Sequence, residues 1–205
     1  MSDIKRKSIV VGVTGGIACG KSEVGRILEG MGFCVCDADH VAHKLMAKGS
    51  TAFLDIVECF GKRILDHDGE ISRPALGGIV FEDPEMRERL NALVHPAVRS
   101  VLEHWIYERR AFRENGAVQI PLLFESGMNG LDFDGIVCVS AGDELILERL
   151  EKRGIGNDAA LRRIHSQMPL AEKERLSDCV IKNHGSLQEL EQATRRAVES
   201  LSVER

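Results

Sequence analysis

Short apolar runs recur along this chain of 205 residues, and the first is continuous rather than alternating with polar residues. The runs occupy residues 8–13, 33–36, 117–124, 135–140 and 179–182. A continuous run rich in valine and isoleucine is typical of a parallel strand that is buried on both faces. The pattern therefore predicts about five strands in one parallel sheet.

Helical periodicity separates these runs. After Lys21, four apolar residues lie at i, i+3, i+4 and i+7, namely Val24, Ile27, Leu28 and Met31. Gly32 then supplies the left-handed stop that ends many helices. The strand, helix and strand over residues 8–36 form a βαβ unit, whose crossover is right-handed in nearly all proteins. Alternation of this kind predicts an α/β fold with a doubly wound parallel sheet.

Residues 39–115 are predicted to be mainly helical, with turns at residues 48–50 and 66–69. Asp83-Pro84 matches an N-cap followed by a first-turn proline. His95 precedes Pro96, which predicts a helix junction, and we interpret His95 as a local hydrogen-bonding residue rather than a catalyst. Two or three helices follow within residues 143–176, and a capping box at Ser186 and Glu189 begins the last helix.

Composition limits the class of protein. The chain has 27 Lys+Arg against 32 Asp+Glu, a formal charge of −5, and 43% apolar residues. This balance excludes disorder as the main state and argues against nucleic acid as a partner. No stretch is apolar enough to cross a membrane, and the six cysteines form no C-x-x-C pair. We therefore expect a cytoplasmic protein with reduced thiols.

A signal peptide is the alternative at the N-terminus, because Lys5-Arg6-Lys7 precedes a mostly apolar stretch that ends at Cys19. Three glycines interrupt that stretch and a Gly-Lys-Ser sequence follows it directly. A phosphate-binding loop accounts for these features better than a secretion signal does.

Residues 15–22 read Gly-Gly-Ile-Ala-Cys-Gly-Lys-Ser and match G-x-x-x-x-G-K-[ST] between a strand and a helix. The glycines let main-chain N–H groups close around a phosphate, and the helix N-terminus adds a positive dipole end. Lys21 would bring a cation to the β- and γ-phosphates, and the Ser22 hydroxyl would ligate Mg²⁺. The loop predicts a P-loop NTPase-type fold that binds ATP.

Size and organisation favour a small-molecule kinase among P-loop proteins. The Asn-Lys-x-Asp box of GTPases is absent, and motor ATPases are much longer. A kinase needs a substrate cradle and a closing lid. We expect one kinase domain over residues 1–205, with a core at about 8–38, 117–142 and 177–204, a helical substrate-binding insertion at about 39–116 and a helical lid at about 143–176.

Asp37 and Asp39 follow the second strand, which we expect beside the P-loop strand. Ligands of open α/β sheets bind at this edge, so a carboxylate there can orient an attacking hydroxyl. Asp39 can equally be the N-cap of the helix that follows, and both roles can hold together. A zinc site among Cys34, Cys36 and neighbouring carboxylates and histidines matches no standard spacing, and alternation along the strand places both cysteines on one buried face.

Five cations lie close together in an otherwise acidic chain, on two predicted helices: Arg149, Lys152, Arg153, Arg162 and Arg163. Alone they would be read as a solvated helix face. Downstream of a P-loop they predict a lid whose arginines neutralise charge on the transferring group.

These features together resemble the dephospho-CoA kinase family over residues 11–190. The resemblance is carried by residues 12–22, Asp37-Ala-Asp39, Arg73-x-x-Leu76 with Val80-Phe81, residues 90–96, residues 121–125, Arg149-x-x-x-Arg153, Arg163-Ile-x-x-Gln167-Met and Asp178-x-Val-Ile-x-Asn183-x-Gly185. It implies that ATP, with Mg²⁺, phosphorylates the ribose 3′-hydroxyl of 3′-dephospho-CoA, the final step of coenzyme A synthesis. Another nucleoside or nucleotide kinase, or a non-catalytic ATP-binding regulator, is the alternative.

The resemblance also implies roles for individual residues. Asp39 would be the base, with Lys21, Arg149 and Arg153 acting on the phosphates. The nucleotide would be held by Gly15, Gly16, Ile17, Ala18, Cys19, Gly20, Lys21, Ser22, Glu23, Arg163, Asn183 and Gly185. The acceptor pocket would include Thr14, Asp37, Asp39, Arg73, Phe81, His95, Pro121, Leu122, Leu123 and Glu125. We expect a monomer, with a weak homo-oligomer as the alternative.

The chain departs from the common family pattern at Ala18-Cys19, which replaces a Gly/Ser pair, and at Glu23, where a hydroxyl residue is frequent. These positions act through the backbone, so the activity is not in doubt. Cys19 becomes a hypothetical site of oxidative inhibition, since a helix N-terminus lowers the pKa of a thiol.

Overall fold

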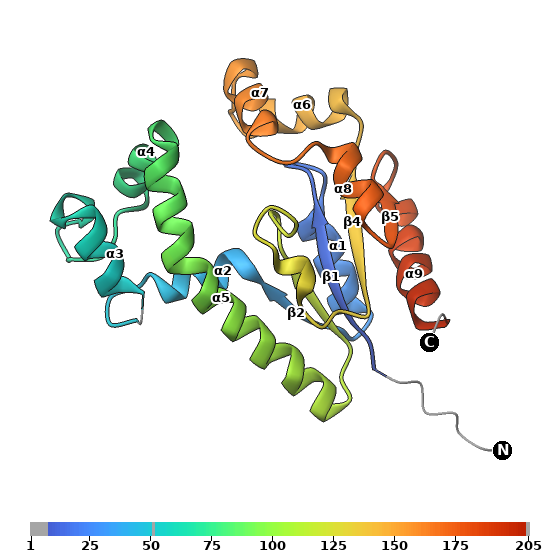
Figure 1. Ribbon diagram of the computed structural model, residues 1–205. Helices are drawn as coiled ribbons and strands as arrows, with labels where there is room; N and C mark the ends of the chain where they lie inside the picture. Colours follow the sequence, from blue (N-terminus) through green and yellow to red (C-terminus); the bar gives the residue numbers. More distant parts are fainter. Residues whose placement is uncertain (1–7, 51, 204–205) are drawn as a thin grey trace. The chain divides into compact units, whose positions relative to one another are not determined.

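The structure is a computed structural model that describes residues 8–50 and 52–203, so the Lys5-Arg6-Lys7 triplet lies outside the described residues. One parallel sheet of five strands runs in the order β2-β3-β1-β4-β5 (Figure 1). The strands are β1 Val10–Gly15, β2 Cys34–Asp37, β3 Gly116–Gln119, β4 Gly135–Ser140 and β5 Cys179–Lys182. The predicted α/β class with a parallel, doubly wound sheet is confirmed.

The helices follow the predicted alternation. They are α1 Lys21–Gly30, α2 Ala38–Leu45, α3 Phe53–Phe60, α4 Arg73–Glu82, α5 Pro84–Phe112, α6 Asp143–Glu151, α7 Asn157–His165, α8 Leu170–Leu176 and α9 Leu187–Val203, with short 3₁₀ turns at Lys62–Ile64 and Met128–Gly130. None of the helices within the described residues has the length and apolar character needed to span a membrane. The described residues up to Asp37 form one compact unit with those from Trp105 to Val203, and Ala38–His104 form the second.

Local signals placed the helix ends correctly. Gly32 has the left-handed φ of 87° expected of a helix stop. Asp83 accepts hydrogen bonds from the N–H groups of Glu85 and Met86, at 2.9 and 3.2 Å, and so caps α5. Before α9, the Ser186 N–H donates to the Glu189 carboxylate at 2.7 Å, and the Glu189 N–H donates to the Ser186 hydroxyl at 3.3 Å.

The prediction that the first two strands are adjacent in the sheet is wrong, because β3 lies between β1 and β2. Gly116 of β3 is in register with Val10 on one side and with Cys34 on the other. The β1–α1–β2 crossover therefore spans two strand positions, and the fully buried β3 fills the gap. Asp37 ends a strand that is two positions from the P-loop strand. Because β2 is an edge strand, Cys34 and Cys36 are half-buried rather than buried as expected.

Three predicted boundaries also change. Strand β3 ends at Gln119, and the chain turns from Pro121 onward because proline has no N–H for the ladder. Asp39 is not the N-cap of α2 but lies within its first turn. Pro96 is not at a junction, since α5 continues through it. The buried residues Val94, Val98, Leu102 and Ile106 recur every fourth position along α5, and burial of that stripe outweighs the cost of about 3 kcal/mol for an interior proline.

The two faces of β1 pack against different side chains in the first unit. Val11 and Val13 belong to a cluster with Val24 of α1, Ile146 of α6 and Val198 of α9. On the other face, a Cβ added to Gly12 would lie 3.0 Å from the Phe133 ring and 3.2 Å from Leu123, so a larger residue there would have to displace these side chains.

All six cysteines are free thiols, and two of them, Cys19 and Cys138, are buried in the core, where they pack as small hydrophobes.

Candidate active site

The loop between β1 and α1 has the backbone that phosphate binding requires. Gly15, Ala18 and Gly20 have positive φ values of 145°, 56° and 101°. A Cβ on Gly15 would lie 2.0 Å from the Val139 carbonyl oxygen, and one on Gly20 would lie 2.3 Å from Asn183 Nδ2. Side chains are therefore excluded at both glycines by conformation and by space together.

The N-terminus of α1 is open to an anion. Gly20 precedes the helix and no side chain caps it, so its first N–H groups and the helix dipole face the loop. The Lys21 ammonium curls over the loop and donates to the carbonyl oxygens of Gly15 and Gly16, at 3.2 and 3.1 Å. Gln119 Nε2, at the end of β3, donates to the Lys21 carbonyl at 2.8 Å and holds the first turn in place. Sequence reasoning missed Gln119, whose contact joins residues far apart in the chain.

A cavity of about 290 Å³ opens beside the loop and gathers five of the residues predicted to bind the nucleotide and both arginines predicted to act on its phosphates. It is lined by Ala18, Gly20, Glu23, Arg149, Arg153, Asn183 and Gly185, together with Leu187 and Leu190. The two leucines were missed, although their i, i+3 spacing directly after Asn183-x-Gly185 could have indicated an apolar wall. A planar base fits such a mixture of apolar surface and a few polar groups.

Two side chains hold the P-loop from segments far away in the sequence. Asn183 Nδ2 donates to the Cys19 carbonyl at 2.9 Å, and both residues are buried. Arg149 Nη1 donates to the Ala18 carbonyl at 3.1 Å, and its Nη2 donates to the Asn183 carbonyl at 3.3 Å. One half-buried guanidinium therefore joins α6, the end of β5 and the loop.

Three of the five cations predicted to lie on helices do so. Arg149 lies on α6, and Arg162 and Arg163 lie on α7. Lys152 and Arg153 lie instead in the exposed turn after α6, because Gly154, with φ of 75°, ends the helix there. Arg163 is exposed and does not line the cavity.

The expected low pKa of Cys19 is wrong. Cys19 has no exposed surface, and its burial raises the pKa of the thiol above the ordinary value, although Lys21 acts in the opposite direction. Desolvation disfavours a thiolate more than the nearby cation favours it. The hypothesis of oxidative inhibition at Cys19 thereby loses its physical basis.

The segment after β3 contains residues that were predicted to contact the acceptor. Leu123 is fully buried, and Leu122 is 41% exposed. The Glu125 carboxylate pairs with the ammonium of Lys173 at 2.8 Å, and the Thr14 hydroxyl donates to the Pro121 carbonyl at 3.3 Å. Lys173 was missed because a lysine in a charged stretch, Ala-Glu-Lys-Glu-Arg, is ordinarily exposed.

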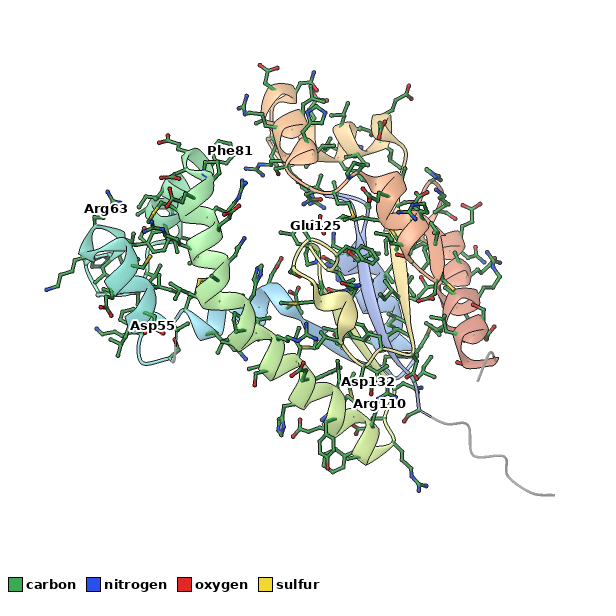
Figure 2. All side chains as sticks on the ribbon, in the orientation of Figure 1. Asp55, Arg63, Phe81, Arg110, Glu125 and Asp132 are labelled. Atoms are coloured by element: carbon green, nitrogen blue, oxygen red, sulfur yellow. The ribbon has the colours of Figure 1, made fainter. Side chains whose placement is uncertain are left out.

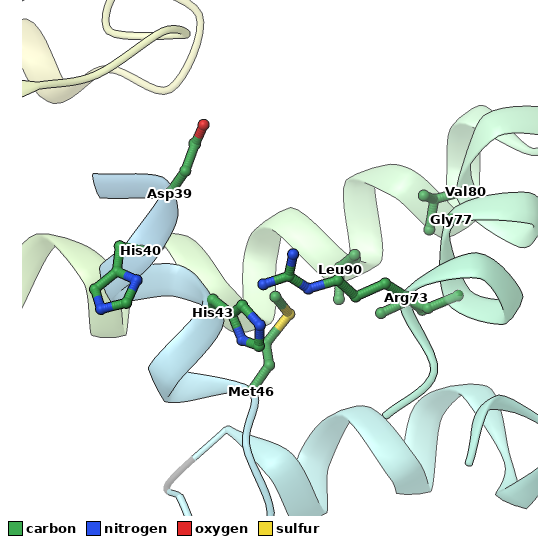
Figure 3. A pocket seen from close by; sticks show the side chains of 9 residues that line it. Asp39, His40, His43, Met46, Arg73, Gly77, Val80 and Leu90 are labelled. Carbon is green, nitrogen blue, oxygen red and sulfur yellow. The ribbon is translucent and has the colours of Figure 1, made fainter. Parts of the chain in front are cut away.

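The second unit has a cavity of its own, of about 420 Å³. Figure 3 shows Arg73 extending from α4 toward His43 of α2 and toward Met46, which directly follows that helix. The lining consists of Asp39, His40, His43, Met46, Arg73, Leu76, Gly77, Val80 and Leu90. It combines a cation, a carboxylate and an apolar wall, which suits a ligand with anionic and apolar parts.

Two other predicted acceptor residues of the second unit do not line this cavity. Phe81 is 65% exposed on α4, and half-buried His95 lies on α5. Burial lowers the pKa of His95, so its neutral form is favoured.

The zinc alternative finds no support where the structure describes the chain. The one group of side chains there with metal-ligand proximity is Asp66, His67 and Asp68, all exposed and in a turn. Cys34 and Cys36 do not belong to it.

Known proteins that resemble this chain match it along nearly its whole length. The family model for dephospho-CoA kinase matches residues 9–189. A dephospho-CoA kinase of Bacillus licheniformis is 44% identical over 186 residues, covering 90% of this chain and 92% of that protein. The structure of a dephospho-CoA kinase from Campylobacter jejuni is 30% identical, with a TM-score of 0.69 over 94% of this chain and 96% of that one. A crystal structure from Thermus thermophilus is 33% identical with a TM-score of 0.80, covering 95% and 98%.

Proposed function

This chain belongs to the dephospho-CoA kinase family, and we propose how its residues divide the work of that reaction, the ATP-dependent phosphorylation of the ribose 3′-hydroxyl of 3′-dephospho-CoA. The product would be coenzyme A, with ADP released. The observation that carries the proposal is the cavity beside the P-loop, in which five residues predicted to bind nucleotide meet the two arginines predicted to act on the phosphates.

ATP binds with its phosphates on the P-loop. The main-chain N–H groups at the start of α1 and the Lys21 ammonium stabilise the negative charge of the β- and γ-phosphates. The adenine of ATP lies against Leu187 and Leu190 near Asn183. Arg149 acts chiefly by fixing the loop carbonyls, while exposed Arg153 is free to turn toward the phosphates.

Mg²⁺ would be held at Ser22. Its hydroxyl is a hard oxygen donor in the exposed first turn of α1, which is the kind of ligand that this ion prefers. When bound, Mg²⁺ supplies charge neutralisation at the phosphates.

Asp39 orients and deprotonates the acceptor hydroxyl. It follows β2 after a single residue and borders the cavity of the second unit. Arg73 and the imidazole groups of His40 and His43 face the anionic part of the acceptor, and Leu76, Val80 and Leu90 face its apolar part. Phosphoryl transfer needs little more than positioning and one oriented base.

A coupled assay of ADP release tests this assignment, with dephospho-CoA, adenosine and dCMP offered as acceptors. We expect release with dephospho-CoA and background rates with the other two. Asp39→Asn should lower kcat by about 10²- to 10⁴-fold and leave ATP affinity unchanged, because it removes the base alone. Asp55→Asn, an exposed carboxylate on α3, is the matched control and should retain full activity. Background release with dephospho-CoA would refute the proposal.

A further inference from the structure

Lys173 of α8 is a lysine whose side chain has no contact with solvent, which is rare unless the charge is paired. Its Nζ lies 2.7 Å from the Pro121 carbonyl oxygen and 2.8 Å from Glu125 Oε1. Pro121 and Glu125 both lie in the loop of residues 121–127 that follows β3 (Glu125 is labelled in Figure 2). One buried ammonium therefore holds this loop at two points, its first residue and its fifth.

Further contacts connect the same loop to its surroundings. The Thr14 hydroxyl of β1 donates to the Pro121 carbonyl at 3.3 Å, and α8 packs against β1 and β4. Glu125 Oε1 also accepts the N–H of Met168 at 2.9 Å, in the connection from α7 to α8. The loop, the end of the P-loop strand and the exit from α7 thus meet at one ion pair.

We propose that Lys173 is a positioning residue for phosphoryl transfer. Its ammonium fixes the curvature of residues 121–125, so that Leu123 stays buried and Leu122 stays exposed. Glu125 acts through this pair and not as a contact to the acceptor. The inference rests on the proposed function and adds a residue that the reaction needs without touching the reacting atoms.

Hydrogen exchange on the full chain tests the restraint itself. Lys173→Met keeps the length of the side chain but removes both contacts, so amides of residues 122–128 and of Met168 should exchange faster. The matched control is Arg110→Met, which breaks another buried pair, since Arg110 lies 3.0 Å from an Asp134 side chain that is 2% exposed. Arg110 lies at the opposite end of the sheet from Glu125 (Figure 2), so exchange of the loop should not change in that variant. Unchanged exchange in Lys173→Met would overturn the proposal.

Kinetics test whether the restraint serves the reaction. With dephospho-CoA, Lys173→Met should lower kcat/KM for the acceptor by about 10- to 100-fold, while KM for ATP changes by less than about threefold. Arg110→Met, far from this loop, should stay within about threefold of wild type. If Lys173→Met fails to fold, Glu125→Ala takes its place, with the same expected loss.

The outcomes separate the two proposals. Wild-type kinetics in Lys173→Met, with turnover otherwise normal, would overturn only the role of Lys173. A wild-type chain that releases no ADP with dephospho-CoA would refute the proposed function, and the role of Lys173 in that reaction would fall with it.

Discussion

Asn183 Nδ2 donates a buried hydrogen bond of 2.9 Å to the carbonyl oxygen of Cys19, joining residues that are 164 positions apart. The bond fastens the end of β5 to the middle of the P-loop. A Cβ added to Gly20 would lie only 2.3 Å from the same Nδ2 atom, which shows how closely the two segments approach.

Asn183→Ala should therefore weaken ATP binding as well as the fold. Loss of one buried hydrogen bond costs about 1 kcal/mol of stability, and the freed loop should raise the Kd for ATP about tenfold. Calorimetric titration with ATP and urea unfolding measure the two effects.

Asn115→Ala is the control for this prediction. The Asn115 side chain accepts from the Ile9 N–H at 3.1 Å, just before β1 and at the other end of that strand from the P-loop. It should lose similar stability and keep its affinity for ATP. Equal loss of affinity in both variants would contradict a local role for Asn183.

Arg149→Lys should impair nucleotide binding although it keeps the charge. Two guanidinium nitrogens donate to two different carbonyl oxygens, those of Ala18 and Asn183, and a single ammonium cannot reproduce that fork. We expect KM for ATP to rise by about tenfold, as measured by steady-state kinetics. Arg195→Lys on α9, where the arginine is 53% exposed, should behave as wild type; a normal KM in Arg149→Lys would show that charge alone suffices.

Gly15→Ala should abolish ATP binding and destabilise the chain severely. The added Cβ would lie 2.0 Å from the Val139 carbonyl oxygen, and φ is 145°, so neither strand β4 nor the backbone can accommodate it. Gly142→Ala is the control, because its Cβ would meet nothing closer than 3.7 Å at an ordinary φ of −69°. Thermal unfolding with and without ATP compares the two; a stable Gly15→Ala chain would contradict the geometry described for this loop.

Alkaline pH should unfold the protein partly through Cys138. Burial raises the pKa of this thiol from 9.0 to about 11, so between these pH values it ionises in the unfolded chain and stays protonated in the folded one. Its contribution to stability is complete below about pH 9 and is lost as pH rises toward 11, with a slope of up to about 1.4 kcal/mol per pH unit.

Cys138→Ala removes this ionisation. The variant should be less stable at neutral pH, because a buried side chain is shortened, but its stability should fall less steeply above pH 9. Urea unfolding at a series of pH values measures the slopes. Parallel curves for the two proteins would show that Cys138 does not ionise as expected.

The phosphate loop, the helix ends and the class of fold followed from the order of residues, because the chemistry that determines them is local. The spacing of Gly15, Gly20 and Lys21, the left-handed stop at Gly32 and the capping box at Ser186 each act within a few residues. A resemblance built on such motifs was enough to indicate the family, which the comparisons confirm.

Tertiary structure alone decided which segments meet. The crossover from β1 to β2 leaves room for a strand that comes some 80 residues later, so β3 separates the two against expectation. Burial of Lys173 and the raised pKa of Cys19 likewise depend on neighbours that are remote in the chain. Desolvation and long-range hydrogen bonds arise only when distant segments pack together, whereas turns and caps are specified by the residues that form them.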